Sequence, residues 1–485
     1  MNERAPRVPR FSVMSLECFE RPVALRLPFR FGAATVRAAP QAFVRATIRA
    51  SDGRVAQGMS AELMIPKWFD KSPQRTNAEN IDALRAALAL ASDAYCEDAS
   101  ARSAFAHAAF HYRALLEQGT RRGLNPLTAS YGAALADRAI LDALCRMHRL
   151  SFADAVRANL PGIDASLTPD LARFDLDAYF SSLTTPASIG VRHTVGIVDP
   201  LTRGDIDRGS APDDGLPVAL EQVIARYGNR HFKLKLGGDV ATDIARLIRI
   251  ASVLDALPGY RVTLDGNEQF ADVQAITALA DALAARPELA RLRDAILYLE
   301  QPLPRSIALA VDVRTIAGAI PLIIDESDAT IDAFPQVRAL GYAGVSSKSC
   351  KGAYKALLNA ARCVCWNAGG MVRAFMTGED LTAQPGLALQ QDLALAGLLG
   401  LTHVERNGHH YANGFTGQHA GLREQQAFLA AHPDLYTASD GQVRVDIRNG
   451  QMSAASLGVH GYASAVLPDV ESLQPMRAPQ TAPAS

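Results

Sequence analysis

The sequence lacks the features that mark several classes of protein. Its 485 residues include only six cysteines, which are scattered and form no Cys-x-x-Cys pair, as expected of free thiols in a reducing compartment. Lysine and arginine together number 49 against 50 acidic residues, so no excess of positive charge is present to bind nucleic acid or an anionic membrane. No apolar run approaches the ~18 residues of a membrane span, and none follows the charged N-terminus. We therefore expect a cytoplasmic protein without a membrane or nucleic-acid partner.

What is present is the composition of a globular protein. Apolar residues make up 48% and charged residues 20% of the chain. At ~100–200 residues per domain, the length suggests two to four domains. The two ends differ from the rest, because 1–10 and 467–485 show no periodicity. The C-terminal one is rich in proline and alanine and is predicted to be a disordered tail.

The N-terminal part of the chain indicates an α+β unit. Apolar and polar side chains alternate over much of Val44–Ala50, Asp52-Gly53 follows as a turn, and the alternation resumes at Val55. This pattern is typical of a β-hairpin. Over 77–150 the periodicity becomes helical, so we expect strands within 11–65 followed by helices.

From about 190 to about 410 the pattern changes to short apolar runs that alternate with helical stretches. Eight runs at near-even spacing are typical of a (β/α)8-type barrel. A doubly wound open sheet is the competing architecture, and the regular spacing of eight units favours the barrel. The runs are His193–Val198, Phe232–Leu236, Arg261–Asp265, Ile296–Glu300, Pro321–Asp325, Ala343–Lys348, Met371–Met376 and Leu401–Glu405.

Charged residues close five successive runs, at the end of a barrel where active sites lie. Lys233 and Lys235 close the second run and share one face, because strand side chains alternate. One carboxylate closes each of the next three runs and a lysine closes the sixth, at Asp265, Glu300, Asp325 and Lys348. Successive positions are 23 to 35 residues apart, which is one βα unit each. We therefore expect these side chains to meet at the barrel mouth.

Three carboxylates on consecutive strands form a set of hard oxygen ligands that suits Mg²⁺ or Mn²⁺. Lysines beside the metal suit proton transfer, because an ammonium group near other cations has a lowered pKa. Together they predict removal of a proton α to a carboxylate, with the metal stabilising the enediolate. The alternative interpretation is that lysine–aspartate salt bridges close the barrel without any chemistry.

In order and spacing, these residues resemble the mandelate racemase/muconate lactonizing branch of the enolase superfamily. The matching pieces are Lys233-Leu-Lys235, Asp265-Gly-Asn267, Glu300-Gln-Pro302, Asp325-Glu-Ser327, and Lys348 with Gly352 after it. The resemblance extends beyond the barrel to a cap loop, a cap hairpin, the helix that leads into the barrel and a C-terminal return. These are 28–32, 52–58, 137–144 and 446–459.

The resemblance implies a TIM-type (β/α)7β barrel with an α+β capping domain, which the N-terminal region and a C-terminal return form together. The predicted division is a capping domain at 11–150, a connecting segment at 151–189, the barrel at 190–410, the return at 411–466 and a disordered tail at 467–485. Compared with the family, the chain carries additional segments near 66–130 and 155–190.

The resemblance also implies roles for single residues. Asp265, Glu300 and Asp325 would bind Mg²⁺, with Mn²⁺ as the alternative. Lys235 and Lys348 would form the acid/base pair on opposite faces of the substrate α-carbon. Lys233 would support Lys235 and neutralise the substrate carboxylate.

Five further residues would support the metal ligands or contact the substrate. Asn267 and Glu326 would support the ligands from behind. Phe31, in the first cap loop, would contact the substrate. Glu405 and Asn407 stand where dipeptide epimerases of the family place Asp-x-Asp to hold the substrate ammonium, and they match that pattern only in part.

With lysines on both faces, the resemblance favours a racemase or epimerase of a small carboxylate substrate, assembled as a homo-oligomer. Cycloisomerisation and β-elimination use the same parts and stay open as alternatives. Two other interpretations are a class I aldolase-like barrel, in which one lysine forms a Schiff base, and a non-catalytic barrel homologue. The three carboxylates argue against the first, and the retained lysines argue against the second.

Overall fold

Eight parallel strands form a closed barrel at the centre of the computed structural model, which describes residues 8–31, 34–207, 209, 211–370 and 373–479. The last strand pairs with the first, Val404 beside Val191, and this closure excludes the doubly wound alternative. The predicted barrel is therefore confirmed. Its strands are β4 (Ser188–Val195), β5 (His231–Lys235), β6 (Arg261–Asp265), β7 (Ile296–Glu300), β8 (Leu322–Ile324), β9 (Gly344–Ser347), β10 (Phe375–Gly378) and β11 (His403–Arg406).

The seventh strand lies later in the chain than its apolar run predicts. The run was placed at Met371–Met376, whereas β10 begins at Phe375 and ends at Gly378. Met371 itself lies outside the described residues. The shift matters for the site, because it makes Glu379 and Asp380 the residues that close this strand.

Helices cover the barrel, and two of them, α7 and α8, begin at aspartates that cap them. Asp239 accepts a hydrogen bond from the backbone N–H of Thr242 at 2.8 Å, and Asp272 accepts one from Ala275 at 2.9 Å. The helices are α6 (Leu220–Tyr227), α7 (Val240–Leu254), α8 (Val273–Ala285), α9 (Ala290–Ala295), α10 (Arg305–Ala308), α11 (Arg314–Ala317), α12 (Ala333–Ala339), α13 (Ala353–Ala368), α14 (Leu387–Leu398) and α15 (Gly408–Tyr411).

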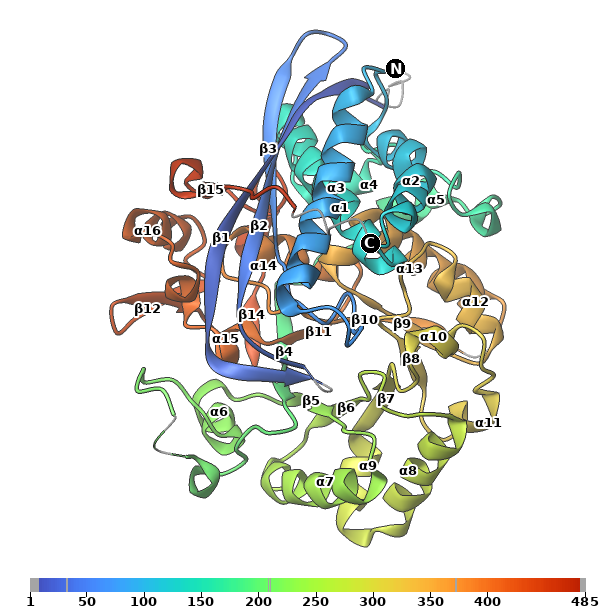
Figure 1. Cartoon of the computed structure of the whole chain (residues 1–485), viewed down its shortest axis with the longest axis vertical. Coiled ribbons are helices and arrows are strands. Elements are labelled where there is room, and N and C mark those ends of the chain that lie inside the picture. Colours follow the sequence, from blue (N-terminus) through green and yellow to red (C-terminus); the bar gives the residue numbers. More distant parts are fainter. Residues whose placement is uncertain (1–7, 32–33, 208, 210, 371–372, 480–485) are drawn as a thin grey trace.

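An antiparallel sheet and three helices form the cap, which stands in the upper half of Figure 1. The predicted hairpin is present, since β2 and β3 pair from Arg49 beside Val55 around a turn at Gly53. Helix α3 crosses α1 so closely that a Cβ at Gly132 would lie 2.0 Å from the carbonyl oxygen of Ala87. The elements are β1 (Phe11–Phe31), β2 (Ala34–Ala50), β3 (Val55–Leu63), α1 (Asn77–Glu97), α2 (Ala104–Arg121) and α3 (Pro126–His148).

The chain after the barrel returns to the cap and corrects one expectation. Gln474 and Pro475 form β15, which pairs with β1, and Leu473 is buried. The predicted disordered tail from 467 is therefore wrong as far as 475, because a short strand can be held by backbone pairing without any periodic apolar pattern. The other elements outside cap and barrel are α4 (Phe152–Arg157), α5 (Leu176–Ser181), α16 (Leu422–Ala431), β12 (Tyr436–Ser439), β13 (Gln442–Val445) and β14 (Gln451–Ser453).

A search of the described residues for a helix with both the length and the apolar character of a membrane span finds none.

One buried carboxyl group in the cap predicts a pH-dependent stability. Asp137 of α3 accepts a hydrogen bond from the Tyr95 hydroxyl at 2.7 Å. Burial raises the pKa of Asp137 from its ordinary value of 3.8 to about 7. The unfolded chain therefore ionises this group first, and its contribution to stability falls as the pH rises from about 4 to about 7. The difference in pKa corresponds to about 4 kcal/mol at most.

Asp137→Asn cannot ionise, so we expect it to unfold at a higher temperature than the unchanged protein at pH 8, with the gap closing near pH 4. Thermal unfolding between pH 4 and pH 8 measures this. Asp294→Asn is the control, because the Asp294 side chain is 77% exposed. Parallel pH profiles for Asp137→Asn and the unchanged protein would contradict the prediction.

Candidate active site

The carboxyl ends of β5 to β9 bring the predicted residues together at the barrel mouth. Lys233 and Lys235 lie on β5, Asp265 and Glu300 are the last residues of β6 and β7, and the remaining two follow β8 and β9 directly. All six are buried, namely Lys233, Lys235, Asp265, Glu300, Asp325 and Lys348. Ion pairs connect these side chains, so the spacing in the sequence predicted a real cluster.

Lys233 is the centre of a group of four carboxylates. Its Nζ lies 2.9 Å from Asp265 Oδ2 and 2.9 Å from Glu300 Oε1. It also donates to Glu379 Oε2 at 2.8 Å and to Glu405 Oε2 at 3.0 Å. The ammonium group of Lys233 therefore contacts two of the three predicted metal ligands in this structure.

Each of the other two lysines pairs with a different predicted ligand. Lys235 Nζ donates to Asp265 Oδ2 at 2.6 Å, and Lys348 Nζ donates to Asp325 Oδ2 at 2.5 Å. Lys351, which the sequence did not predict, lies 3.3 Å from Asp325 Oδ1. The pairs place Lys235 and Lys348 on separate strands and on separate carboxylates.

The neighbouring charges set the pKa values of this cluster. Burial and the carboxylates of Asp265 and Glu379 raise the pKa of Glu300 well above its usual value. Burial alone would lower the pKa of Lys348, but the Asp325 carboxylate raises it above the usual value for lysine. The predicted lowering concerns a lysine beside a bound cation, whereas here the charged neighbour nearest to Lys348 is the carboxylate of Asp325.

Of the two residues predicted to support the ligands, Asn267 contacts one of them and Glu326 contacts Asn267. The backbone N–H of Asn267 donates to Asp265 Oδ1 at 2.9 Å, and its side-chain amide donates to Glu326 Oε1 at 3.2 Å. Gln301 holds the backbone of a second predicted ligand, since its Oε1 accepts a hydrogen bond from the backbone N–H of Asp325 at 2.9 Å. Asn267 and Gln301 both adopt positive φ, 41° and 35°, so the turns after β6 and β7 are held in unusual conformations.

The cap loop after β3 covers the barrel mouth. The indole ring of Trp68 lies 4.1 Å from Lys348 Nζ, measured to the ring centroid. Arg305 of α10 donates to the carbonyl oxygens of Trp68 and Phe69 at 2.9 Å and 2.8 Å. Lys71 lies 3.0 Å from Glu326 and so ties the same loop to the barrel.

A small cavity of about 20 Å³ lies between the cap and the lysines. Its lining combines the three predicted lysines, which are buried, with apolar side chains of the cap. The lining residues are Phe29, Ile65, Trp68, Lys233, Lys235, Asn267, Lys348, Asp380, Leu381, Thr382, Glu405 and Asn407. Two of the predicted substrate contacts, Glu405 and Asn407, are thus at the cavity. Phe31 ends β1, and its side chain lies outside the described part of the chain.

Sequence reasoning missed the acidic pair after β10 and the buried residues that hold it. Glu379 pairs with Arg192 of β4 and accepts a hydrogen bond from the Tyr298 hydroxyl at 2.8 Å. The backbone N–H of Asp380 donates to Glu405 at 2.9 Å. With the strand at Phe375–Gly378, Glu379 and Asp380 directly follow its end, as the other charged residues follow or end theirs, and the sequence would then have indicated them.

The three predicted ligands fit a divalent cation by their chemistry. They are buried carboxylates on consecutive strands, the oxygen donors that Mg²⁺ prefers. Glu300 Oε2 is buried and has no partner with hydrogen-bond geometry among the described residues, although Lys233 Nζ lies 2.8 Å away. No choice of one oxygen from each of the three carboxylates brings all three within 4.8 Å of one another. Each carboxylate instead accepts a hydrogen bond from a lysine. A cation at this position would compete with these lysines, above all with Lys233.

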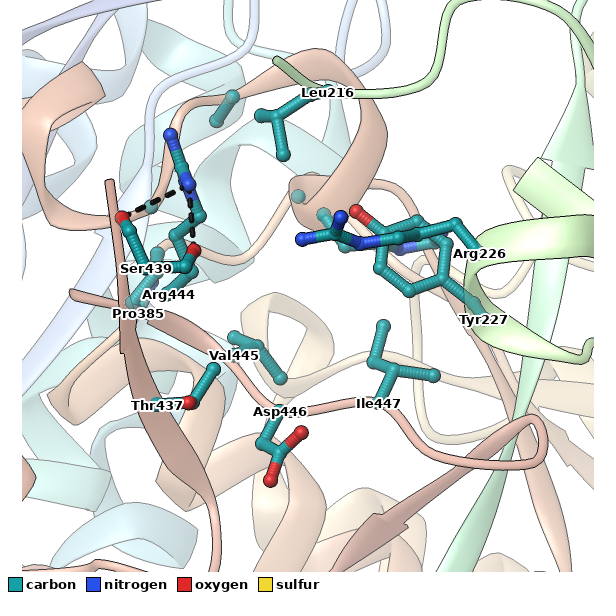
Figure 2. A pocket seen from close by; sticks show the side chains of 14 residues that line it. Leu216, Arg226, Tyr227, Pro385, Thr437, Ser439, Arg444, Val445, Asp446 and Ile447 are labelled. Atoms are coloured by element: carbon teal, nitrogen blue, oxygen red, sulfur yellow. Dashed lines mark hydrogen bonds between the residues drawn. The ribbon is translucent and has the colours of Figure 1, made fainter. Parts of the chain in front are cut away.

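A second, larger cavity of about 80 Å³ is shown in Figure 2. It is bounded by α6 and by the β12–β13 hairpin, and it shares no lining residue with the cavity beneath the cap. Arg444 at its edge donates to the backbone and side-chain oxygens of Ser439 at 3.1 Å and 2.7 Å. None of the predicted site residues lines it.

Residues 216–411 match the model of a known protein family, Enolase C-terminal domain-like. The matched segment contains all six charged residues of the barrel mouth. The barrel therefore carries an enolase C-terminal-like domain, and the resemblance found in the sequence is confirmed. No curated protein matches the sequence of the chain.

Several solved structures share the fold over nearly the whole chain. A dipeptide epimerase from Enterococcus faecalis, complexed with Mg and the dipeptide L-Leu-L-Tyr, has a TM-score of 0.58 at 14% identity and covers 93% of this chain and 99% of its own. An enolase from Bradyrhizobium, complexed with magnesium and mandelic acid, has 0.56 at 14%, covering 92% and 94%. A mandelate racemase/muconate lactonizing enzyme from Roseovarius nubinhibens has 0.57 at 14%, covering 96% of each. At these identities the likeness shows the fold.

Proposed function

We propose that this protein is a Mg²⁺-dependent enzyme that removes the proton α to a carboxylate, with racemisation or epimerisation as its reaction. The observation that carries the proposal is the meeting of Lys235 and Lys348 at one cavity, each beside a different carboxylate of the predicted metal site. A lysine on each of two strands supplies a base and an acid at one substrate carbon.

Asp265, Glu300 and Asp325 would hold the cation, whose positive charge would stabilise the negative charge on the deprotonated substrate. One lysine, in its neutral amine form, takes the α-proton and becomes an ammonium. The lysine on the other face, in its ammonium form, donates a proton to the same carbon and becomes a neutral amine. Lys233 adds a fixed positive charge beside the substrate carboxylate, and the cap loop with Trp68 excludes water.

The lining of the cavity supports a small acid with an apolar substituent. Phe29, Ile65, Trp68 and Leu381 supply its apolar surface. The carboxylates opposite them are already paired, since Glu405 accepts from Lys233 at 3.0 Å and Asp380 accepts from the backbone N–H of Asn407 at 2.7 Å. This arrangement argues against an ammonium group at that end of the substrate, and so against a dipeptide.

Cycloisomerisation and β-elimination begin with the same proton transfer and differ only in what the carbanion does next. The choice between them depends on the substrate, because a leaving group or an internal nucleophile at the β-position would redirect the same intermediate. We retain racemisation because Lys235 and Lys348 reach one cavity from two different strand ends, the placement that proton transfer to and from a single carbon requires. We also expect the homo-oligomeric assembly that the resemblance implies.

The test is exchange of the α-proton with solvent deuterium. The full-length protein with Mg²⁺ is incubated in D₂O with a panel of small 2-substituted carboxylic acids, and the α-proton signal is followed by NMR. We expect exchange with at least one acid, and loss of that exchange when a chelator removes the metal. Exchange that persists under chelation, or borohydride trapping of a carbonyl substrate on a lysine, would overturn the proposal in favour of a Schiff-base enzyme.

A further inference from the structure

Two histidines and an aspartate gather in the cap, far along the chain from the barrel-mouth residues. His107 and His111 lie one turn apart on α2, and Asp98 is the residue that caps the end of α1. One possible ligand atom from each lies within 4.8 Å of the other two, and among the described residues this is the one group of three or more with that property. Both histidines are buried, at 0% and 6% exposure.

The hydrogen bonds of His107 leave one ring nitrogen free. Its Nε2 lies 2.8 Å from the carbonyl oxygen of Phe11, and because a carbonyl can only accept, this nitrogen carries the hydrogen. Nδ1 then has a lone pair, and it is buried without a partner among the described residues. A metal-bound histidine shows this pattern, with its other ring nitrogen donating to a backbone carbonyl.

His111, one turn later on α2, also has a buried ring nitrogen without a hydrogen bond to any described residue. This nitrogen is Nε2, and it lies 3.5 Å from Asp98 Oδ2. Burying two ring nitrogens without hydrogen bonds costs free energy. A ligand that bound both nitrogens would recover this cost.

The three side chains are the donors of a transition-metal site. The set is two imidazole rings and one carboxylate, the ligands that Zn²⁺ takes with an open fourth position for water.

We propose that Asp98, His107 and His111 bind one divalent transition metal of the Zn²⁺ type, as a structural site independent of the barrel mouth. The metal would join the end of α1 to α2. Strand β1 is already tied to this connection, because Phe11 and Arg102 exchange two backbone hydrogen bonds of 3.0 Å. The site would thus hold β1, α1 and α2 together at one point of the cap.

Arg102 is the positive charge that opposes this site. Its Nε donates to Asp98 Oδ2 at 3.0 Å, and its guanidinium group lies 3.8 Å from the centroid of the Phe110 ring. An arginine on a metal-bound carboxylate is compatible with binding, since a carboxylate oxygen has a second lone pair. The competing interpretation is that His111 simply donates to Asp98, with no metal.

The experiment is a titration of the full-length, metal-free protein with Co²⁺ in excess Mg²⁺, followed by displacement with Zn²⁺. We expect one equivalent of Co²⁺ with the visible absorption of a four-coordinate site, no thiolate charge-transfer band, and release by Zn²⁺. His111→Gln and Asp98→Asn should each weaken binding at least 10-fold. Asp98→Asn keeps the test valid if the buried histidine variant does not fold, because the Asp98 side chain is only partly buried, 12% exposed, and asparagine has the same shape.

The control is His432→Gln, which replaces a buried histidine whose ring nitrogens are both partnered, by Ser456 and by the backbone N–H of Ala465. Binding retained in this control and lost in the two cluster variants supports the site. No stoichiometric Co²⁺ binding, binding unchanged in both cluster variants, or equal loss in the control would overturn it. Loss of α-proton exchange is not required, so failure of this site and failure of the proposed reaction are separate results.

Discussion

Lys348→Met is expected to abolish racemisation, with a fall of about 10²–10⁴-fold, the usual contribution of a positioned acid or base. The substitution removes the only titratable group that the β9 end presents to the cavity lining, while the methionine keeps the apolar contact with Trp68. Asp325 retains Lys351 at 3.3 Å, so the carboxylate is not left unpaired. Racemisation followed by polarimetry, beside exchange in D₂O, measures the effect.

The two readouts should separate in this variant. If Lys235 and Lys348 act on opposite faces, Lys348→Met still exchanges the α-proton of one enantiomer through Lys235, but it cannot complete the inversion. Lys355→Met is the matched control, because Lys355 is buried and pairs with Asp328 but does not line the cavity. We expect this control to keep both activities within a few-fold. If Lys348→Met and Lys235→Met both racemise normally, the two-base mechanism is wrong.

The barrel and its charged strand ends could be predicted because each follows from a local rule. Short apolar runs identify the strands, and parallel strands of a barrel all end at one face, so Asp265, Glu300 and Asp325 had to meet. The hairpin at Gly53 was equally local. The error in the seventh strand also has a local cause, because the apolar run at 371–376 ends before the strand does. Glu379, which follows the strand, was therefore not recognised as a site residue.

The environment of those residues could not be predicted from the sequence. Trp68 lies above Lys348 because Arg305 and Lys71 fasten the cap loop, a contact between segments more than 230 residues apart. The four carboxylates around Lys233 come from four strands, and only the closed barrel places them at one ammonium group. The raised pKa of Lys348 could not be predicted for the same reason, because the direction of the shift depends on which charge lies nearest in the folded barrel.

Lys233→Met should destabilise the metal-free protein by about 3–5 kcal/mol, the cost of removing one partner from a buried ion-pair cluster. Asp265 keeps Lys235 and Glu379 keeps Arg192, but Glu300 and Glu405 lose the ammonium group nearest to them. Denaturant unfolding in the presence of a chelator measures the loss.

Adding Mg²⁺ distinguishes this cluster from an ordinary buried ion pair. If the cation and Lys233 compete for the same carboxylates, removing Lys233 leaves negative charge that Mg²⁺ can satisfy, so Mg²⁺ should stabilise Lys233→Met more than it stabilises the unchanged protein. Arg21→Met is the matched control, because it breaks an equally buried pair, 2.7 Å from Glu424, outside the barrel mouth. It should lose stability that Mg²⁺ does not restore. An equal response to Mg²⁺ in Lys233→Met, Arg21→Met and the unchanged protein would mean that these carboxylates serve Lys233 alone, and the metal assignment of Asp265 and Glu300 would have to be given up.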